Sequence, residues 1–330
     1  MPREKTSLDW REFRIIDAHT HLASTDYAPR RFIEGVADNI RAKAASAGRS
    51  FPRAATIAML QQHYRDHDGR EFVAALQDSS VAAAIVLLPD FSHAFALDEP
   101  YRNLLDRHTK VVNAHCGLVQ FVGPDPRARD ALSVFEHAVA NCGAKGLKLY
   151  PPCGYRMDDP VLDPFYALCS DHGLPVLFHS GPTTPTLSFT EAHPMTVDHA
   201  ALRFPDVNFI IAHGGVHNLE SSIQLCAYRP NVYLDVAGFL ETPGGWRRNF
   251  ATLFAAGISH KIIFGTDWPV FSGSAGYAAC LSELCAADSP LIETDRRDLE
   301  LFFADNISRL VPALDEYATP QAKEPCYDGA

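Results

Sequence analysis

The chain has 330 residues, a length that suits either two domains or one barrel with insertions. Its formal charge is −11, from 29 basic and 40 acidic residues, which excludes a basic nucleic-acid-binding surface. Hydrophobic residues make up 47% of the chain, enough for a large core, and no apolar run of about 18 or more residues predicts a membrane span.

The cysteines give no sign of a structural metal site. Eight are scattered along the chain, and none forms a Cys-x-x-Cys pair. The first residues, MPREKTSLDWREF, lack the apolar segment of a signal peptide. We therefore expect a cytoplasmic protein with reduced, buried thiols.

Eight short apolar runs, rich in Val, Ile and Phe, predict strands that are buried on both faces, as in a parallel sheet. In chain order they are Arg14–Leu22, Ala82–Pro89, Val111–Val122, Ala144–Tyr150, Pro175–Gly181, Asn208–Gly214, Val232–Phe239 and Lys261–Asp267.

Helical patterns lie between most of these runs. Asp130–Cys142 begins with a candidate Asp cap, and Leu162–His172 ends before Gly173. Strands that alternate with helices predict the α/β class, and eight strands predict a distorted TIM (β/α)8 barrel as a single domain over residues 1–330. An open doubly wound sheet is disfavoured because no Gly-x-Gly-x-x-Gly turn follows the first strand.

Residues 23–80 form a long insertion after the first predicted strand. They include charged, helix-like stretches such as Ile57–His67. In a barrel this segment would lie over the mouth, where it could be a lid or the contact surface of a homodimer. A plain surface insertion fits the sequence equally well.

The segment Asp17-Ala18-His19-Thr20-His21 is the strongest chemical signal. On a strand, alternate side chains point the same way, so Asp17, His19 and His21 are predicted to share one face. Two imidazoles facing into a barrel are costly to bury unless a metal ion binds them. They also lie at the carboxyl end of the strand, where barrel active sites form.

Three other predicted strands also end in polar residues. These residues are His179 on the fifth strand, His213 on the sixth and Asp267 on the eighth. Alternation places them inward together with Leu177, Ile211 and Gly265. Imidazole nitrogens with a carboxylate oxygen make a suitable donor set for zinc.

This pattern resembles the amidohydrolase superfamily, and the strings IIDAHTHL, PVLFHSG, IIAHGG and IIFGTDWP resemble its amidohydrolase-2 branch. That branch includes aminocarboxymuconate-semialdehyde decarboxylase and related hydrolases, lactonases and decarboxylases. The resemblance covers about Ile15 to Leu310, including the closing helix Leu299–Leu310. Its motifs are specific for the fold and the metal site, and weak for the substrate.

The resemblance implies that His19, His21, His179 and Asp267 hold one divalent ion, Zn²⁺ or another such as Mn²⁺, which activates a water molecule. It gives Asp267 the role of moving the proton of that water, and His213 that of polarising the substrate carbonyl or holding its oxyanion. Asp17 would support the ligands from behind or cap a neighbouring backbone segment.

Lys148, on the fourth predicted strand, leaves two alternatives open. An inward-facing lysine in a barrel needs a partner. The string Lys-Leu-Tyr-Pro is similar to dihydroorotase, in which a carboxylated lysine bridges two metal ions. Lys148 would then bridge one ion on His19, His21 and Asp267 and a second on His179 and His213. We favour an unmodified Lys148 that binds a substrate carboxylate.

The remaining polar candidates are weaker. His115 is expected in the core, and Asp235 either faces the mouth or caps a loop. Arg156, Trp246 and Trp268 follow strand ends, where they could line a pocket, although structural roles fit them better.

Three functions fit the sequence, and all three require a small-molecule partner. The first is metal-dependent hydrolysis of a small amide, lactone or ester. The second is non-oxidative decarboxylation of an aromatic or unsaturated acid, which would use the same ligands. The third is a catalytically inactive ligand-binding barrel, for which we would expect a lost ligand, and none is missing.

Overall fold

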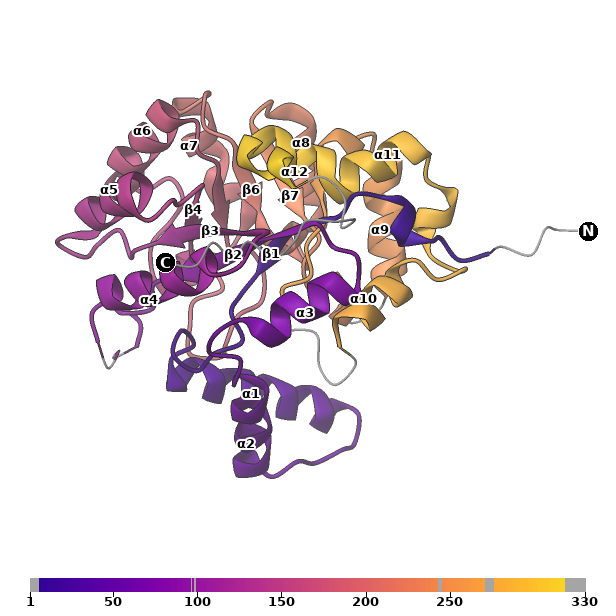
Figure 1. Ribbon diagram of the computed structural model, residues 1–330, viewed down its shortest axis with the longest axis horizontal. Helices are drawn as coiled ribbons and strands as arrows, with labels where there is room; N and C mark the ends of the chain where they lie inside the picture. Colours follow the sequence, from indigo (N-terminus) through magenta and orange to yellow (C-terminus); the bar gives the residue numbers. More distant parts are fainter. Residues whose placement is uncertain (1–5, 96, 98, 243–244, 271–275, 318–330) are drawn as a thin grey trace, which may run out of the picture.

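A computed structural model describes residues 6–95, 97, 99–242, 245–270 and 276–317 (Figure 1). Eight parallel strands form one sheet in chain order, which confirms the predicted TIM barrel. The strands are β1 (Ile16–Thr20), β2 (Ala83–Pro89), β3 (Leu118–Gly123), β4 (Leu147–Leu149), β5 (Val176–Phe178), β6 (Phe209–Ile211), β7 (Val232–Asp235) and β8 (Ile262–Ile263).

The barrel closes where the segment after β8 meets β1. The amide of Ala18 donates to the carbonyl of Phe264 at 3.0 Å, and the amide of Asp267 donates to the carbonyl of His19 at 2.8 Å. An isolated parallel bridge joins Thr20 to Trp268. The closure therefore ties two of the predicted ligand positions together through the main chain.

Helices surround the barrel (Figure 1). They are α1 (Arg30–Ser46), α2 (Arg53–His63), α3 (Arg70–Asp78), α4 (Tyr101–Asn113), α5 (Ala131–Asn141), α6 (Asp163–His172), α7 (Asp198–Arg203), α8 (Leu219–Tyr228), α9 (Trp246–Ala255), α10 (Tyr277–Leu284), α11 (Arg296–Glu300) and α12 (Asn306–Leu310). Within the described residues, none is both long and apolar enough to cross a membrane.

The third predicted strand was placed too early in the chain. Residues 111–113 end α4, and β3 begins at Leu118. The helix continues because Leu104, Leu105 and Val112 share its buried face. His115 therefore lies in the turn between α4 and β3, partly exposed, where its Nε2 atom is 2.6 Å from the carbonyl oxygen of Asp68. The prediction of a core histidine was wrong.

The apolar side chains form two main layers. A smaller cluster fills the barrel interior and includes Ile16, Ala18, Ile85, Phe121, Leu177, Ile210 and Ile263. Residues of α12 belong to the same cluster, so this helix closes one end of the interior. A larger cluster joins the other strand faces to the surrounding helices. Buried side chains on both faces explain the continuous apolar runs in the sequence.

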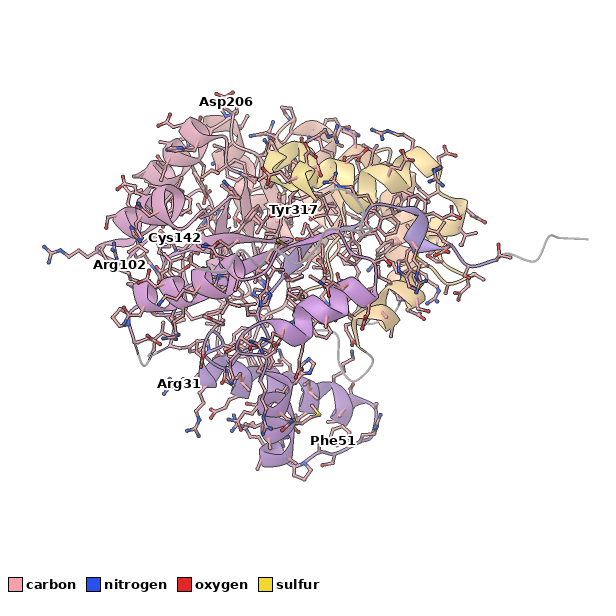
Figure 2. All side chains as sticks on the ribbon, viewed as in Figure 1. Arg31, Phe51, Arg102, Cys142, Asp206 and Tyr317 are labelled. Carbon is pink, nitrogen blue, oxygen red and sulfur yellow. The ribbon has the colours of Figure 1, made fainter. Side chains whose placement is uncertain are left out.

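The segment 23–80 contains three helices. In Figure 1, α1 and α2 project below the barrel, while α3 lies against it near α10. The helices α1 and α2 share a small core of their own, built from Ile33, Ala37 and Leu60. Phe51 lies at the far end of this projection (Figure 2).

Six of the cysteines in the described residues carry free thiols, and five of these are buried, as expected. Cys116 is the exception because it is disulfide-bonded. It lies in the turn before β3 and is exposed. Cys326 lies outside the described residues.

Gly123, at the end of β3, is fixed by the close approach of β4. A Cβ atom at this position would lie 1.4 Å from the carbonyl oxygen of Lys148. We expect Gly123→Ala to lower the free energy of unfolding by about 3 kcal/mol, because the main chain beside Lys148 must move. Urea unfolding monitored by circular dichroism measures the change.

Gly143→Ala provides the matched control. Gly143 has a φ of 70°, but nothing lies within 4 Å of its added Cβ. Gly143→Ala should lower the free energy of unfolding by only about 1 kcal/mol, because alanine is strained in the left-handed backbone conformation. Equal destabilisation by the two substitutions would contradict the role given to the contact between β3 and β4.

Candidate metal centre

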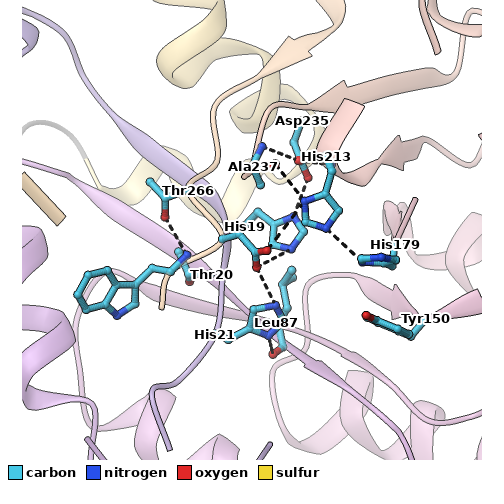
Figure 3. A network of polar contacts seen from close by, with 12 residues as sticks. His19, Thr20, His21, Leu87, Tyr150, His179, His213, Asp235, Ala237 and Thr266 are labelled. Atoms are coloured by element: carbon cyan, nitrogen blue, oxygen red, sulfur yellow. Dashed lines mark hydrogen bonds and ion pairs between the residues drawn. The ribbon is translucent and has the colours of Figure 1, made fainter. Parts of the chain in front are cut away.

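Four histidines and one aspartate line the same cavity from four parts of the barrel. Figure 3 shows the four histidines close together. His19 and His21 come from β1 and its end, and His179 directly follows β5. His213 and Asp267 follow β6 and β8. The structure therefore brings together all the ligand positions that the sequence predicted.

Strict strand alternation does not explain all of this placement. Ile16 and Ala18 face the barrel interior, whereas Asp17 contacts Tyr277 of α10. The pairing of β1 with β2 shifts between Asp17 and Thr20, so that His19 lines the cavity although Asp17 does not. The prediction that Asp17 shares the face of the two histidines was wrong because of this irregularity.

His213 departs from alternation in another way. Ile210 and Ala212 face the interior, and Ile211 packs against the outer helices. His213 reaches the cavity because its backbone is left-handed, with a φ of 59°. Asp267 has the same φ of 59°. Left-handed backbone at a residue other than glycine costs about 1–3 kcal/mol and is concentrated at functional sites.

Each of the four imidazoles has one nitrogen next to an oxygen acceptor on the outside of the site. The Nδ1 atom of His19 is 2.9 Å from Oδ2 of Asp235, and that of His21 is 3.0 Å from the carbonyl of Leu87. For His213, Nδ1 lies 3.0 Å from the carbonyl of Ala237. For His179, Nε2 lies 3.2 Å from the carbonyl of Pro182.

These acceptors determine which ring nitrogen carries hydrogen. A carbonyl or carboxylate oxygen can only accept, so the nitrogen beside it must donate. The other nitrogen of each neutral ring then presents its lone pair to the cavity. Histidines that bind metals in proteins are oriented by this arrangement.

The inward atoms form two close groups. Oδ1 of Asp267 lies 3.4 Å from Nε2 of His19 and 3.3 Å from Nε2 of His21. Nδ1 of His179 and Nε2 of His213 face each other at 3.1 Å. Two lone pairs at this distance repel unless a cation lies between them, and ligands of one metal ion have similar separations. The donor set therefore fits a divalent ion.

Burial affects the protonation of these groups. Burial, reinforced by neighbouring cations, holds the pKa of His19 and His179 well below the usual range. Burial raises the pKa of Asp267, but His19, His21 and His213 lower it more, so that it lies below its ordinary value. Neutral imidazoles and an ionised carboxylate are the forms that bind metals.

Asp235, which the sequence left open, proves to be central to the site. Its Oδ1 atom accepts from the amides of His213 at 2.8 Å and Ala237 at 3.0 Å, while Oδ2 contacts His19. One fully buried carboxylate thus orients two of the histidines. No local pattern marks this residue, because both histidines are distant in sequence.

Asp17 caps backbone, as one of its two predicted alternatives proposed. Its carboxylate accepts from the amides of His19 and Thr266 at 3.1 and 3.0 Å. The hydroxyls of Thr266 and Tyr277 also donate to it. Burial raises the pKa of Asp17 to about 6, although these hydrogen bonds oppose the shift. Asp17 thus anchors the segment that carries Asp267.

Lys148 faces the cavity from β4 and is 1% exposed. Among the described residues, no hydrogen bond or ion pair holds its ammonium group. Burial lowers the pKa of Lys148 to about 8, against the attraction of Asp267 and Asp235. The structure thus fits a lysine that is available to a substrate group.

Of the three weaker candidates, Arg156 and Trp246 do not line this cavity, while Trp268 directly follows Asp267 and accepts from the amide of His21 at 2.6 Å. Arg156 is half-exposed and pairs with Asp158 at 2.8 Å. Trp246 contacts Glu283 through Nε1 at 3.4 Å, and Trp268 stacks on Phe72. The structural interpretation fits Arg156, whereas Trp246 and Trp268 also line a second cavity, as the pocket-lining alternative proposed. A separate cluster of Asp106, His137 and Cys142 lies on the outer helices, and could compete for added metal.

The cavity above the donor atoms has a volume of about 600 Å³. The barrel loops form most of its wall, and α1 supplies Phe32, Val36, Asn39, Ile40 and Lys43. Part of the predicted insertion therefore encloses the site, as a lid would. The cavity is large enough for a small-molecule substrate.

An amidohydrolase family model (Amidohydro_2) matches residues 16–313. The chain belongs to this family. A TIM-barrel protein from Bordetella bronchiseptica is similar in structure, with 17% identity and a TM-score of 0.64 over 92% of this chain and all of that one. No curated protein matches the chain in sequence.

Two other structures similar to this amidohydrolase carry names with an activity. One is 5-carboxyvanillate decarboxylase from Novosphingobium aromaticivorans, complexed with manganese and 4-hydroxy-3-methoxy-5-nitrobenzoic acid, with 13% identity, a TM-score of 0.61, and coverage of 94% and 99%. The other is a candidate 2-pyrone-4,6-dicarboxylic acid hydrolase from Acinetobacter baumannii, with 15% identity, a TM-score of 0.58, and coverage of 91% and 100%. These similarities show a shared fold.

Asp235→Asn tests how the histidines are oriented. The amide keeps the size of the side chain but can present a donor to Nδ1 of His19, which would turn the ring or reverse its tautomer. We expect zinc affinity to fall about 10- to 100-fold, measured by competition with a chromophoric chelator. The exposed Asp315→Asn, 67% accessible, is the control. Unchanged zinc affinity in Asp235→Asn would contradict the assigned role.

Metal content distinguishes one ion from two. We expect about one Zn²⁺ or Mn²⁺ per chain, and its loss in both His19→Ala and His179→Ala. In a two-ion site with carboxylated Lys148, each substitution would remove only one of two ions. Elemental analysis in a Cys142→Ser background excludes metal held by the outer cluster. Two ions in that background, after growth with bicarbonate, would contradict the one-ion expectation.

Proposed function

We propose that this protein is a metal-dependent hydrolase that acts on a small amide, lactone or ester. One observation carries the proposal: four imidazoles with outward hydrogen-bond partners present their inner nitrogens, together with Asp267, to the base of one cavity. In this proposal His19, His21, His179 and Asp267 hold one divalent ion, preferably Zn²⁺. Such an ion supplies Lewis acidity, which lowers the pKa of a water molecule and polarises a carbonyl group.

Asp267 is proposed as the group that moves the proton. Oδ1 faces the two histidines of β1, while Oδ2 lies 3.9 Å from Nδ1 of His213. The second oxygen can therefore accept the proton of the attacking water and pass it to the leaving group. General base catalysis of this kind contributes about 10²- to 10⁴-fold to the rate.

The proposed role of His213 depends on its protonation. Its Nδ1–H donates to Ala237, so a neutral ring cannot donate from Nε2. His213 can stabilise an oxyanion only as an imidazolium, and as a neutral ring it is placed to bind metal beside His179. Lys148 is proposed to bind a substrate carboxylate or the oxyanion.

Decarboxylation of an aromatic or unsaturated acid is the second candidate. The observation that favours it is Lys148, a buried cation beside the donor atoms at the base of a largely apolar cavity. A carboxylate held there loses its hydration, which favours the spreading of its charge as CO₂ leaves. The similarity in fold to 5-carboxyvanillate decarboxylase is consistent with this alternative.

The two candidates release different products. Zinc-loaded protein should acidify solutions of small lactones or esters in a pH-stat or release amine from small amides, and should release no CO₂ from aromatic acids. CO₂ release without hydrolysis would replace the first candidate by the second.

Asp267→Asn should lower kcat at least about 100-fold, with Asp315→Asn as the control. Metal and ligand binding without turnover of any compound would support the inactive barrel.

A further inference from the structure

Positive charge on the cavity wall is confined to two lysines among the described residues. Lys43 lies at the rim, where its Nζ atom is 2.9 Å from Oε2 of Glu241, so its charge is offset. Lys148 lies at the base, beside the metal-binding atoms. In the sequence, the internal residues outside the described ranges, at 96, 98, 243–244 and 271–275, include no Lys or Arg. One cation, with the proposed metal ion, thus remains to bind an anion.

A continuous row of rings forms one side of the cavity between Lys43 and Lys148. Phe32 of α1 lies 5.0 Å from Phe91, and Phe91 lies 4.9 Å from Tyr150, between ring centres. Tyr150 stacks on His179 at 4.3 Å. The row therefore extends from the insertion to a proposed metal ligand. The rest of the wall combines aliphatic side chains such as Leu22, Val36 and Ile40 with Tyr27, Tyr64 and Phe189. It also includes polar side chains, namely Asn39, His108, Thr183, Thr184, His217, Glu241 and Thr242.

The outermost ring is held in place by contacts of α1 with the loop after β5. The side-chain amide of Asn39 donates to the carbonyl of Thr183 at 3.0 Å. A Cβ atom on Gly35 would lie 2.6 Å from Cβ of Thr184, so the helix approaches this loop as closely as glycine allows. The hydroxyl of Tyr150 also contacts that of Thr183, at 2.7 Å. The contacts of one loop thus align Phe32 with the rest of the row.

We propose that the cavity selects a planar, unsaturated monocarboxylate and rejects molecules with a second carboxylate. The inference rests on the proposed function, in which Lys148 binds the substrate carboxylate at the base of the cavity. The flat body then packs against the rings of Phe32, Phe91 and Tyr150. A second carboxylate would face the rest of the wall without an unpaired lysine or arginine among the described residues to offset its charge.

Isothermal titration calorimetry of carboxylates with the zinc-loaded full chain tests the proposal. Two matched pairs are compared: benzoate with isophthalate, and 2-pyrone-6-carboxylate with 2-pyrone-4,6-dicarboxylate. The monocarboxylate should bind at least about 10-fold more tightly in each pair. Equal or tighter binding of the dicarboxylates would overturn the inference, as would the absence of binding by both monocarboxylates.

Two substitutions locate the selectivity in the insertion. Ile40→Arg supplies a second cation and should improve dicarboxylate binding about 10-fold, relative to the monocarboxylates. Phe32→Leu should lower the affinity for benzoate about 3- to 10-fold, while the affinity for cyclohexanecarboxylate should stay unchanged. Phe51→Leu, 39% exposed on the same insertion, is the control and should change neither. Thermal melts establish whether each variant is folded. If a variant is not folded, the comparison of the two ligand pairs on the wild-type protein decides the question.

The outcomes separate this inference from the proposed function. Selective binding of monocarboxylates without hydrolysis of any ester, lactone or amide would support the inference and refute hydrolysis. Hydrolysis together with equal binding of monocarboxylates and dicarboxylates would support the proposed function and refute the inference.

Discussion

The candidate metal centre depends on hydrogen bonds made behind it. Each imidazole donates outward to a fixed oxygen, and the inner nitrogens acquire their direction and their lone pairs from that contact. Three of the four acceptors are main-chain carbonyls, so the folded backbone itself specifies the tautomers. Asp235 supplies the fourth and also accepts from the amide of His213. A change in the loops that carry these oxygens would alter the site without altering any ligand.

The sequence predicted the barrel because its strands are buried on both faces and therefore appear as apolar runs. It also predicted the ligand positions, since polar residues at the ends of such runs have few structural explanations. Alternation correctly paired Leu177 with His179. It failed at His19, where the pairing of β1 with β2 shifts, and at His213, where the backbone is left-handed. Both departures are set by contacts with other strands, which a local pattern does not contain.

The sequence marked Asp235 as a candidate that faces the mouth or caps a loop, but it did not give its role in orienting two histidines, nor did it give the wall of the cavity. Asp235 looks like any carboxylate near a strand end until β7 is placed beside His19 and His213. Phe32 lies in a segment with no strand or ligand motif, and only the fold sets it against Phe91. The start of the third strand was predicted too early because Val111 and Val112, which belong to α4, adjoin the apolar run of β3. Polar residues at the ends of apolar runs were therefore recovered, and residues whose role depends on contacts outside such a motif were missed.

The barrel and the segment 23–80 supply different parts of the site. The donor atoms belong to the strand ends, while the outermost ring of the cavity belongs to α1, and α1 packs with α2 around a separate small core of Ile33, Ala37 and Leu60. Substitutions in this helical pair first change its own small core. They affect the site through the side chains of α1 that line the cavity. Substitutions in α1 can therefore reshape one side of the cavity while the donor atoms at the strand ends of the barrel keep their positions.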